Sequence, residues 1–147
     1  MTIDENGMAK TAEKKLEVAT RIYHLVVQKY GVKPHDLIFD TLTFTLGSGD
    51  EEFRKAGLET IEGIRRIKQN LPGVKTSLGI SNISFGLSPQ VRHVLNSVFL
   101  HYAIEAGLDM AIVHASRIMP LYKIDEQGRE LCRKLISDER KYEEVAA

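Results

Sequence analysis

Polar side chains follow three short apolar runs of the sequence. Asp40 follows LIF, Ser81 and Asn82 follow GI, and His114 follows AIV. In parallel α/β proteins, ligands bind at the carboxyl ends of the strands, where side chains and loop amides converge. If the three runs are neighbouring strands, these side chains lie on one rim. The Asp40 carboxylate can accept hydrogen bonds from two adjacent N–H groups, and the Asn82 amide offers one donor and one acceptor. Together they suit an uncharged ligand that contains a fused-ring amide and an exocyclic amine.

Each of these residues also has a purely structural interpretation. Asp40 could cap a turn, Asn82 could form an Asx turn, and His114 could be a satisfied core histidine. Other chemistries lack their motifs, because the sequence contains no GxxxxGK[ST], no GxGxxG after a strand, no G-x-S-x-G and no H-E-x-x-H. The remaining histidines make no metal-ligand spacing with one another, so we expect no metal site.

Amphipathic helices alternate with the apolar runs. We expect helices from Thr11 to Gly31, from the turn LGSGDEE to LPG, from Ser88-Pro89 to Gly107, and from Asp125 to Ser137. We expect strands at LIFD, at TSLGIS and at MAIV, with the second opening into a loop at Asn82. The consecutive apolar residues of LIFD predict a strand buried on both faces. This alternation predicts an α/β fold with a parallel sheet and right-handed crossovers.

Composition restricts the classes of partner. The 147 residues carry 20 Lys and Arg against 20 Asp and Glu, and the signs are interleaved, which argues against a nucleic-acid binder. The short basic clusters KKLEVATR and IRRIK are interpreted as solvated helix faces. No apolar run reaches the ~18 residues of a membrane helix, and MTIDENGMAK lacks a signal peptide's apolar stretch, so we expect a cytoplasmic protein. The lone Cys132 is expected to be an inert buried thiol.

Three longer segments resemble a known family. IFDTLTFTLGSGDEEF, ETIEGIRRIKQNLPGV and LGISNISFGLSPQVRHVLNSVFLHYAIEAGLDMAIVHAS are similar to the methyltetrahydrofolate-binding (pterin-binding) domain of cobalamin-dependent methionine synthases. The resemblance covers residues 1–140 and leaves 141–147 as a polar tail. It implies an α/β fold that is part of a (βα) TIM barrel of the pterin-binding type, with LIFD, SLGISN and AIV as parallel strands 6 to 8. Since a whole barrel takes about 250 residues, we expect only its C-terminal portion here.

The resemblance also assigns roles to individual residues. Asp40 matches an aspartate that hydrogen-bonds the pterin ring, and Asn82 matches the asparagine that helps to stabilise the protonated methyl-bearing nitrogen. Methyl transfer from a tertiary amine needs that protonation, so Asn82 is the expected catalytic residue. Arg92 matches an arginine near the pterin, whereas His114 stands where relatives carry Asn or Asp. The expected substrate-binding set is Asp40, Gly79, Ser81, Asn82, Arg92 and His114.

The implied reaction is methyl transfer from 5-methyltetrahydrofolate, the methyl-donor substrate, to cob(I)alamin. The cobalamin motif D-x-H-x-x-G is absent, so cobalamin is expected only on a partner domain or protein, and one cysteine cannot supply the zinc ligands of a homocysteine-binding half. We expect the isolated chain to be inactive.

Two alternatives remain open. One is a related pterin-binding enzyme, either a corrinoid protein methyltransferase or dihydropteroate synthase; the latter is disfavoured because the loop where it would carry a lysine reads SNISFG. The other is a non-catalytic barrel fragment that associates with a partner, or with itself as a homo-oligomer, to cover open sheet edges.

Overall fold

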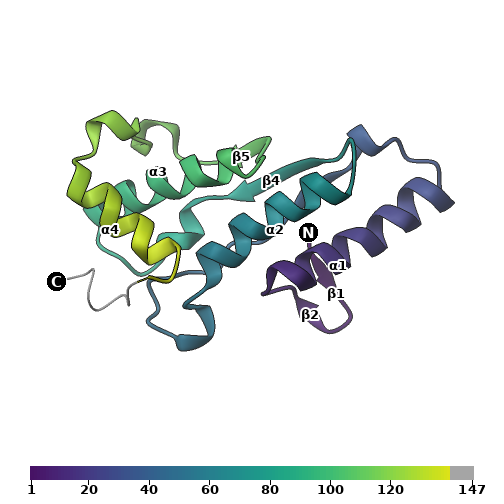
Figure 1. Ribbon diagram of the computed structural model, residues 1–147, viewed down its shortest axis with the longest axis horizontal. Helices are drawn as coiled ribbons and strands as arrows, with labels where there is room; N and C mark the ends of the chain where they lie inside the picture. The colour runs from purple at the N-terminus through teal and green to yellow at the C-terminus, as the bar shows by residue number, and fades with distance from the viewer. Residues whose placement is uncertain (140–147) are drawn as a thin grey trace.

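A computed structural model describes residues 1–139 of the chain, and the polar tail expected at 141–147 lies outside them. A parallel sheet with strand order β3-β4-β5 lies at the centre. Its strands are β3 (Ile38–Asp40), β4 (Lys75–Gly79) and β5 (Met110–Ile112). The helices are α1 (Ala12–Tyr23), α2 (Ala56–Asn70), α3 (Pro89–Glu105) and α4 (Glu126–Ile136), and β1 (Ile3–Asp4) and β2 (Gly7–Met8) form a separate antiparallel hairpin. The molecule is elongated, with α1 and α4 toward opposite ends (Figure 1).

The expected α/β fold with a parallel sheet is confirmed. The register pairs Asp40 with Ser77, and Ser77 with Met110, so all strands run in the same direction. Helix α2 connects β3 to β4, and α3 connects β4 to β5. Because the strands follow one another in sequence order, crossovers of the same hand leave both helices on one face of the sheet.

The two faces of this sheet differ sharply in burial. Phe39 and Leu78 point into the helical side and are 1% and 0% exposed. On the opposite face Ile38, Met110 and Ile112 are 50%, 41% and 69% exposed. The expectation that the LIFD strand is buried on both faces is therefore wrong for the described residues, because helices cover only one side of it.

Two apolar clusters hold the helices to the sheet. The larger one joins α2, β4, α3 and α4 through residues that include Ile64, Leu78 and Phe99, each 0% exposed. The smaller one joins α1, β3 and the end of α2 through Ala19, Phe39 and Ile67. Cys132 lies in the larger cluster, where burial raises the pKa of its thiol to about 11, so the predicted burial of this thiol is confirmed.

Most helix ends form where the sequence predicts them. The Thr11 hydroxyl accepts a hydrogen bond from the Lys14 amide at 3.2 Å and begins α1. Gly31 adopts a φ of +71° after that helix has ended in a π-helical turn. Strand β4 ends at Gly79 rather than near Asn82, because a 3-10 helix begins two residues after Gly79 and spans Ser81–Ser84. The β1-β2 hairpin was not predicted.

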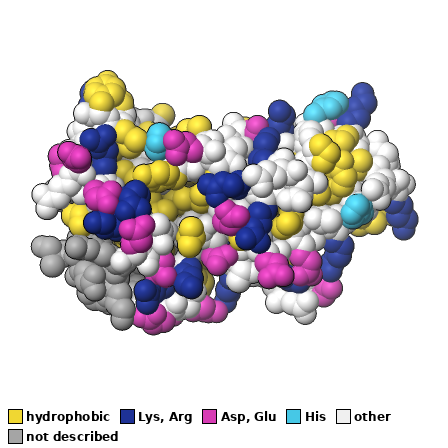
Figure 2. All heavy atoms as spheres, viewed as in Figure 1, with side chains coloured by type: hydrophobic (Ala, Val, Ile, Leu, Met, Phe, Trp, Pro, Cys, Tyr) yellow, Lys and Arg dark blue, Asp and Glu magenta, His cyan; other side chains and the backbone are white. Residues whose placement is uncertain are grey.

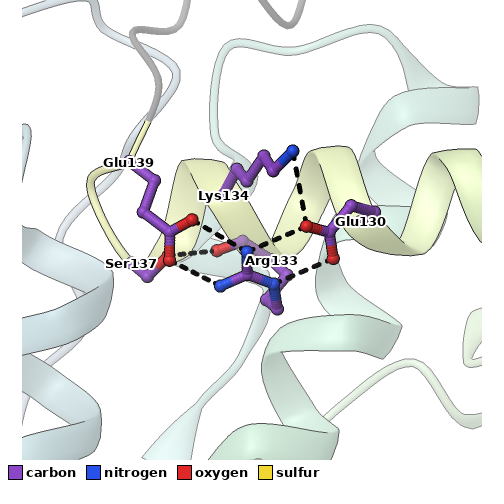
Figure 3. Close-up of polar contacts among 5 residues, drawn as sticks. All are labelled: Glu130, Arg133, Lys134, Ser137 and Glu139. Carbon is purple, nitrogen blue, oxygen red and sulfur yellow. Dashed lines mark hydrogen bonds and ion pairs between the residues drawn. The ribbon is translucent and has the colours of Figure 1, made fainter.

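An exposed ion-pair network lies at the C-terminal end of α4 (Figure 3). The Arg133 guanidinium donates to Glu130 at 2.9 Å and to Glu139 at 2.6 Å, and these hydrogen bonds lower the pKa of both carboxyls to about 2. Side chains of both charges are interspersed over the face in Figure 2, as the neutral composition predicts. Within residues 1–139, no helix is long and apolar enough to span a membrane.

Candidate functional site

The carboxyl ends of the strands carry the polar residues singled out in the sequence. Asp40 ends β3, Gly79 ends β4, and His114 follows β5 by two residues. The register pairs Asp40 with Ser77 and Gly79 with Ile112, so these strand ends lie at one edge of the sheet. The expected rim is therefore present.

Asp40 caps a turn with one carboxylate oxygen and keeps the other available. Its Oδ1 accepts a hydrogen bond from the Leu42 amide at 2.8 Å, so the turn-cap interpretation is correct for that atom. No hydrogen bond within residues 1–139 occupies Oδ2. The Asp40 carbonyl also accepts from the Thr2 amide at 2.9 Å, which fixes the N-terminal residues beside the outer edge of β3.

Asn82 presents an unpaired amide. Its side chain is exposed on the 3-10 helix Ser81–Ser84 and has no hydrogen-bond partner in the described part of the chain, so the Asx-turn interpretation is wrong. A Cβ built on Gly79 would lie 3.8 Å from Asn82 Nδ2. The lack of a side chain at Gly79 thus leaves the sheet open beneath this amide.

Arg92 forms hydrogen bonds to the turn that carries Asn82. Its Nη2 donates to the Ser81 carbonyl at 3.3 Å and its Nε to the Ser84 hydroxyl at 3.2 Å. The Ser84 hydroxyl in turn lies 2.7 Å from Asn96 Oδ1. The spacing of four residues between Arg92 and Asn96 places both on one helix face, which is the signal by which sequence analysis could have added Asn96; Ser84 has no such spacing signal.

His114 lies on the surface. Its Nδ1 is 3.0 Å from the Ser116 hydroxyl, and the ring is exposed. The core-histidine interpretation is therefore wrong. No group of three or more His, Cys, Asp or Glu side chains suited to a metal ion is found in residues 1–139.

The loop that follows Asp40 is tied to the turn that carries Asn82. The Leu46 amide donates to the Ile83 carbonyl at 2.9 Å, and the Thr45 hydroxyl donates to the Phe85 carbonyl at 2.7 Å. Gly47 allows this approach, because a Cβ there would lie 2.5 Å from the Phe85 oxygen. The two halves of the rim are thereby joined by backbone contacts.

Replacing Gly47 by alanine is expected to separate the two loops. The new methyl group would meet a backbone oxygen that cannot move as a side chain can, so we expect a loss of about 1–2 kcal/mol in unfolding free energy, measured with urea. Amide exchange at Leu46 should accelerate. Ser48→Ala changes the neighbouring exposed residue and should cost less than about 0.5 kcal/mol. Equal effects of the two substitutions would contradict this account.

A buried lysine lies behind Asp40. Lys15 on α1 is 0% exposed, and its Nζ donates to the carbonyls of Ala9 at 2.9 Å and Thr41 at 2.5 Å. Desolvation lowers the pKa of Lys15 to about 8, against the opposing attraction of Glu59 and Asp40. The interpretation of KKLEVATR as a solvated face is therefore wrong for this residue. Its spacing of three from Ala12 and four from Ala19, both buried, was the missed signal.

A parallel sheet with helices on one face and polar groups at the carboxyl ends of its strands is typical of α/β domains that bind ligands at that edge. Residues 1–114 match the family described as pterin binding enzyme, and the chain belongs to that family. All six expected site residues fall within this range.

Two curated relatives are methionine synthases. Those of Mycobacterium tuberculosis (strain ATCC 25618 / H37Rv) and Mycobacterium leprae (strain TN) are each 52% identical to this chain over 141 residues. The aligned region covers 96% of this chain but 12% of each relative's length. The chain thus corresponds to a small part of these proteins.

Proposed function

We propose that this chain carries part of the methyltetrahydrofolate site of a methionine synthase. The observation that carries the proposal is the pair of unoccupied polar groups on one rim, Oδ2 of Asp40 and the side-chain amide of Asn82. The similarity to two methionine synthases supports the choice of substrate. No observation favours dihydropteroate synthase or a corrinoid protein methyltransferase over this function.

We propose further that the sheet forms strands 6 to 8 of a (βα) barrel. Three parallel strands in sequence order with their connecting helices on one face are the repeating plan of such a barrel. Its interior is filled by strand side chains, and this role suits the exposed Ile38, Met110 and Ile112. The bond from the Thr2 amide to the Asp40 carbonyl supports a preceding strand on the outer side of β3.

In the proposed mechanism, the chain binds the pterin and assists its protonation. The free oxygen of Asp40 accepts N–H groups of the pterin ring and orients it. Asn82 accepts a hydrogen bond from the protonated methyl-bearing nitrogen, whose protonation lets it leave as a neutral amine when the methyl group departs. Cobalamin on a partner domain or protein supplies the methyl acceptor. Association of the chain with a second copy through its open sheet edges stays a prediction.

Asn82→Ala tests the catalytic role. In a complete barrel that contains this sequence, we expect methyl transfer from 5-methyltetrahydrofolate to fall about 10²–10³-fold, because the amide stabilises the protonated nitrogen in the transition state. Single-turnover rates with cob(I)alamin measure this effect, and equilibrium dialysis measures the accompanying change in binding. Asn70→Ala, on the exposed end of α2, is the matched control and should change neither. Unchanged turnover in Asn82→Ala would remove the proposed role.

A further inference from the structure

Lys15 is the only lysine or arginine among the buried residues of the described chain. Its aliphatic stem crosses α2 at Gly63, where a built Cβ would lie 2.7 Å from Lys15 Cδ. The stem thus lies between α1 and α2, and the ammonium group lies at the carboxyl end of β3. Taking this charge out of water is costly, so its location calls for an explanation beyond helix packing.

The ammonium group binds the turn that directly follows Asp40. It donates to the Thr41 carbonyl at 2.5 Å and lies 3.3 Å from the Leu42 carbonyl. The Thr60 hydroxyl on α2 donates to the same Leu42 carbonyl at 3.0 Å. Two helices therefore hold one peptide group of this turn.

The turn needs such support because its backbone is strained. Leu42 has a φ of +62°, in the left-handed region that branched and bulky residues rarely adopt. The Leu42 amide donates to Asp40 Oδ1, 2.8 Å away, and it belongs to the same peptide group as the Thr41 carbonyl that Lys15 binds. The orientation of the Asp40 carboxylate is thus linked, through Leu42, to the carbonyls that Lys15 holds.

We propose that Lys15 is a positioning residue of the pterin site: its ammonium group fixes the turn at residues 41 and 42 and thereby aims Asp40 at the ligand. This inference rests on the proposed function, because it takes Asp40 as a pterin ligand. Lys15 is fully buried and binds the carbonyls of residues 41 and 42 from the interior of the protein. The groups that face it are Glu59 on α2, Asp40 on β3 and the Phe44 ring, whose centroid is 5.3 Å from Nζ.

The first test measures amide hydrogen exchange in the full 147-residue chain without ligand. Lys15→Met keeps the stem and removes the ammonium group, and Lys33→Met makes the same substitution at an exposed lysine between α1 and β3. We expect exchange at Leu42 to accelerate about tenfold in Lys15→Met, with α3 amides unchanged and Lys33→Met like the original chain. Unchanged exchange at Leu42, or equal acceleration throughout the fold, would overturn the proposal.

A second measurement needs no substitution and so holds even if Lys15→Met does not fold. In the unaltered chain, the NMR resonances of Lys15 Nζ and of the Leu42 amide should titrate together with a midpoint near pH 8. A Leu42 resonance that stays constant from pH 7 to about 9.5, while Nζ titrates, would overturn the proposal.

Ligand binding separates this inference from the proposed function. Equilibrium dialysis with 5-methyltetrahydrofolate should show about tenfold weaker binding by Lys15→Met than by Lys33→Met in a complete barrel containing this sequence. If the unaltered barrel does not bind this ligand, the proposed function fails, whereas the role of Lys15 in ordering Leu42 is decided by amide exchange alone. If binding is intact and equal in both variants, Lys15 does not position the site.

Discussion

Gly63→Ala is expected to destabilise the chain by about 2 kcal/mol, although alanine is the better helix former by about 1 kcal/mol. The new methyl group would lie 2.7 Å from Lys15 Cδ, and the Lys15 stem has little freedom to yield because its ammonium group is held by backbone carbonyls. Urea unfolding monitored by circular dichroism measures the effect.

A double-mutant cycle with Lys15→Ala identifies the cause of that loss. Once the long side chain is gone, the methyl group at position 63 has space, and Gly63→Ala should stabilise the Lys15→Ala chain by up to about 1 kcal/mol through helix propensity. The same destabilisation in both backgrounds would show that the clash lies elsewhere.

Raising the pH from about 8 to 10.5 is expected to stabilise the fold through Lys15. The pKa of Lys15 is about 8 in the folded chain against a model-compound value of 10.5. Between these values the unfolded chain binds the proton more tightly, so folding becomes more favourable as the pH rises, by up to about 3 kcal/mol. Below pH 8 both states are protonated and the full cost of the buried charge is present.

Unfolding free energies at several pH values, compared between variants, isolate this contribution. Lys15→Met should lose the rise between pH 8 and 10.5 that the unaltered chain shows, and Lys33→Met should keep it, because Lys33 is exposed. Parallel stability profiles for Lys15→Met and the unaltered chain would contradict the assignment of the rise to Lys15.

The sequence was sufficient to predict the parallel sheet and its polar rim. Short apolar runs separated by amphipathic helices mark strands covered by helices, and the residue after each run falls at a carboxyl end. Asp40 and Asn82 were therefore found without any knowledge of their contacts. Only the structure shows that Asp40 caps a turn through one oxygen and that the Asn82 amide is unpaired, because both depend on contacts that the sequence does not reveal.

Features that depend on distant contacts were not predicted. Lys15 is buried because Gly63, far along the chain, leaves space for its stem and because carbonyls of a strained turn accept its protons. Strand β4 ends at Gly79 because a 3-10 helix follows at Ser81–Ser84, and Arg92, on a helix later in the chain, binds that turn. The uncovered sheet face could not be inferred from LIFD, because an apolar run does not indicate whether the described chain contains the element that covers it.

The backbone contact between Leu46 and Ile83 has a thermodynamic consequence for recognition. Because the loop of Asp40 and the turn of Asn82 are ordered together during folding, the entropy of fixing them is lost before any ligand arrives. A ligand that bridges the two groups then binds to a surface already shaped for it, and the binding free energy is reduced little by loop ordering. The peptide groups of Leu46 and Ile83 thus contribute both to the stability of the fold and to the affinity of the proposed site for its ligand.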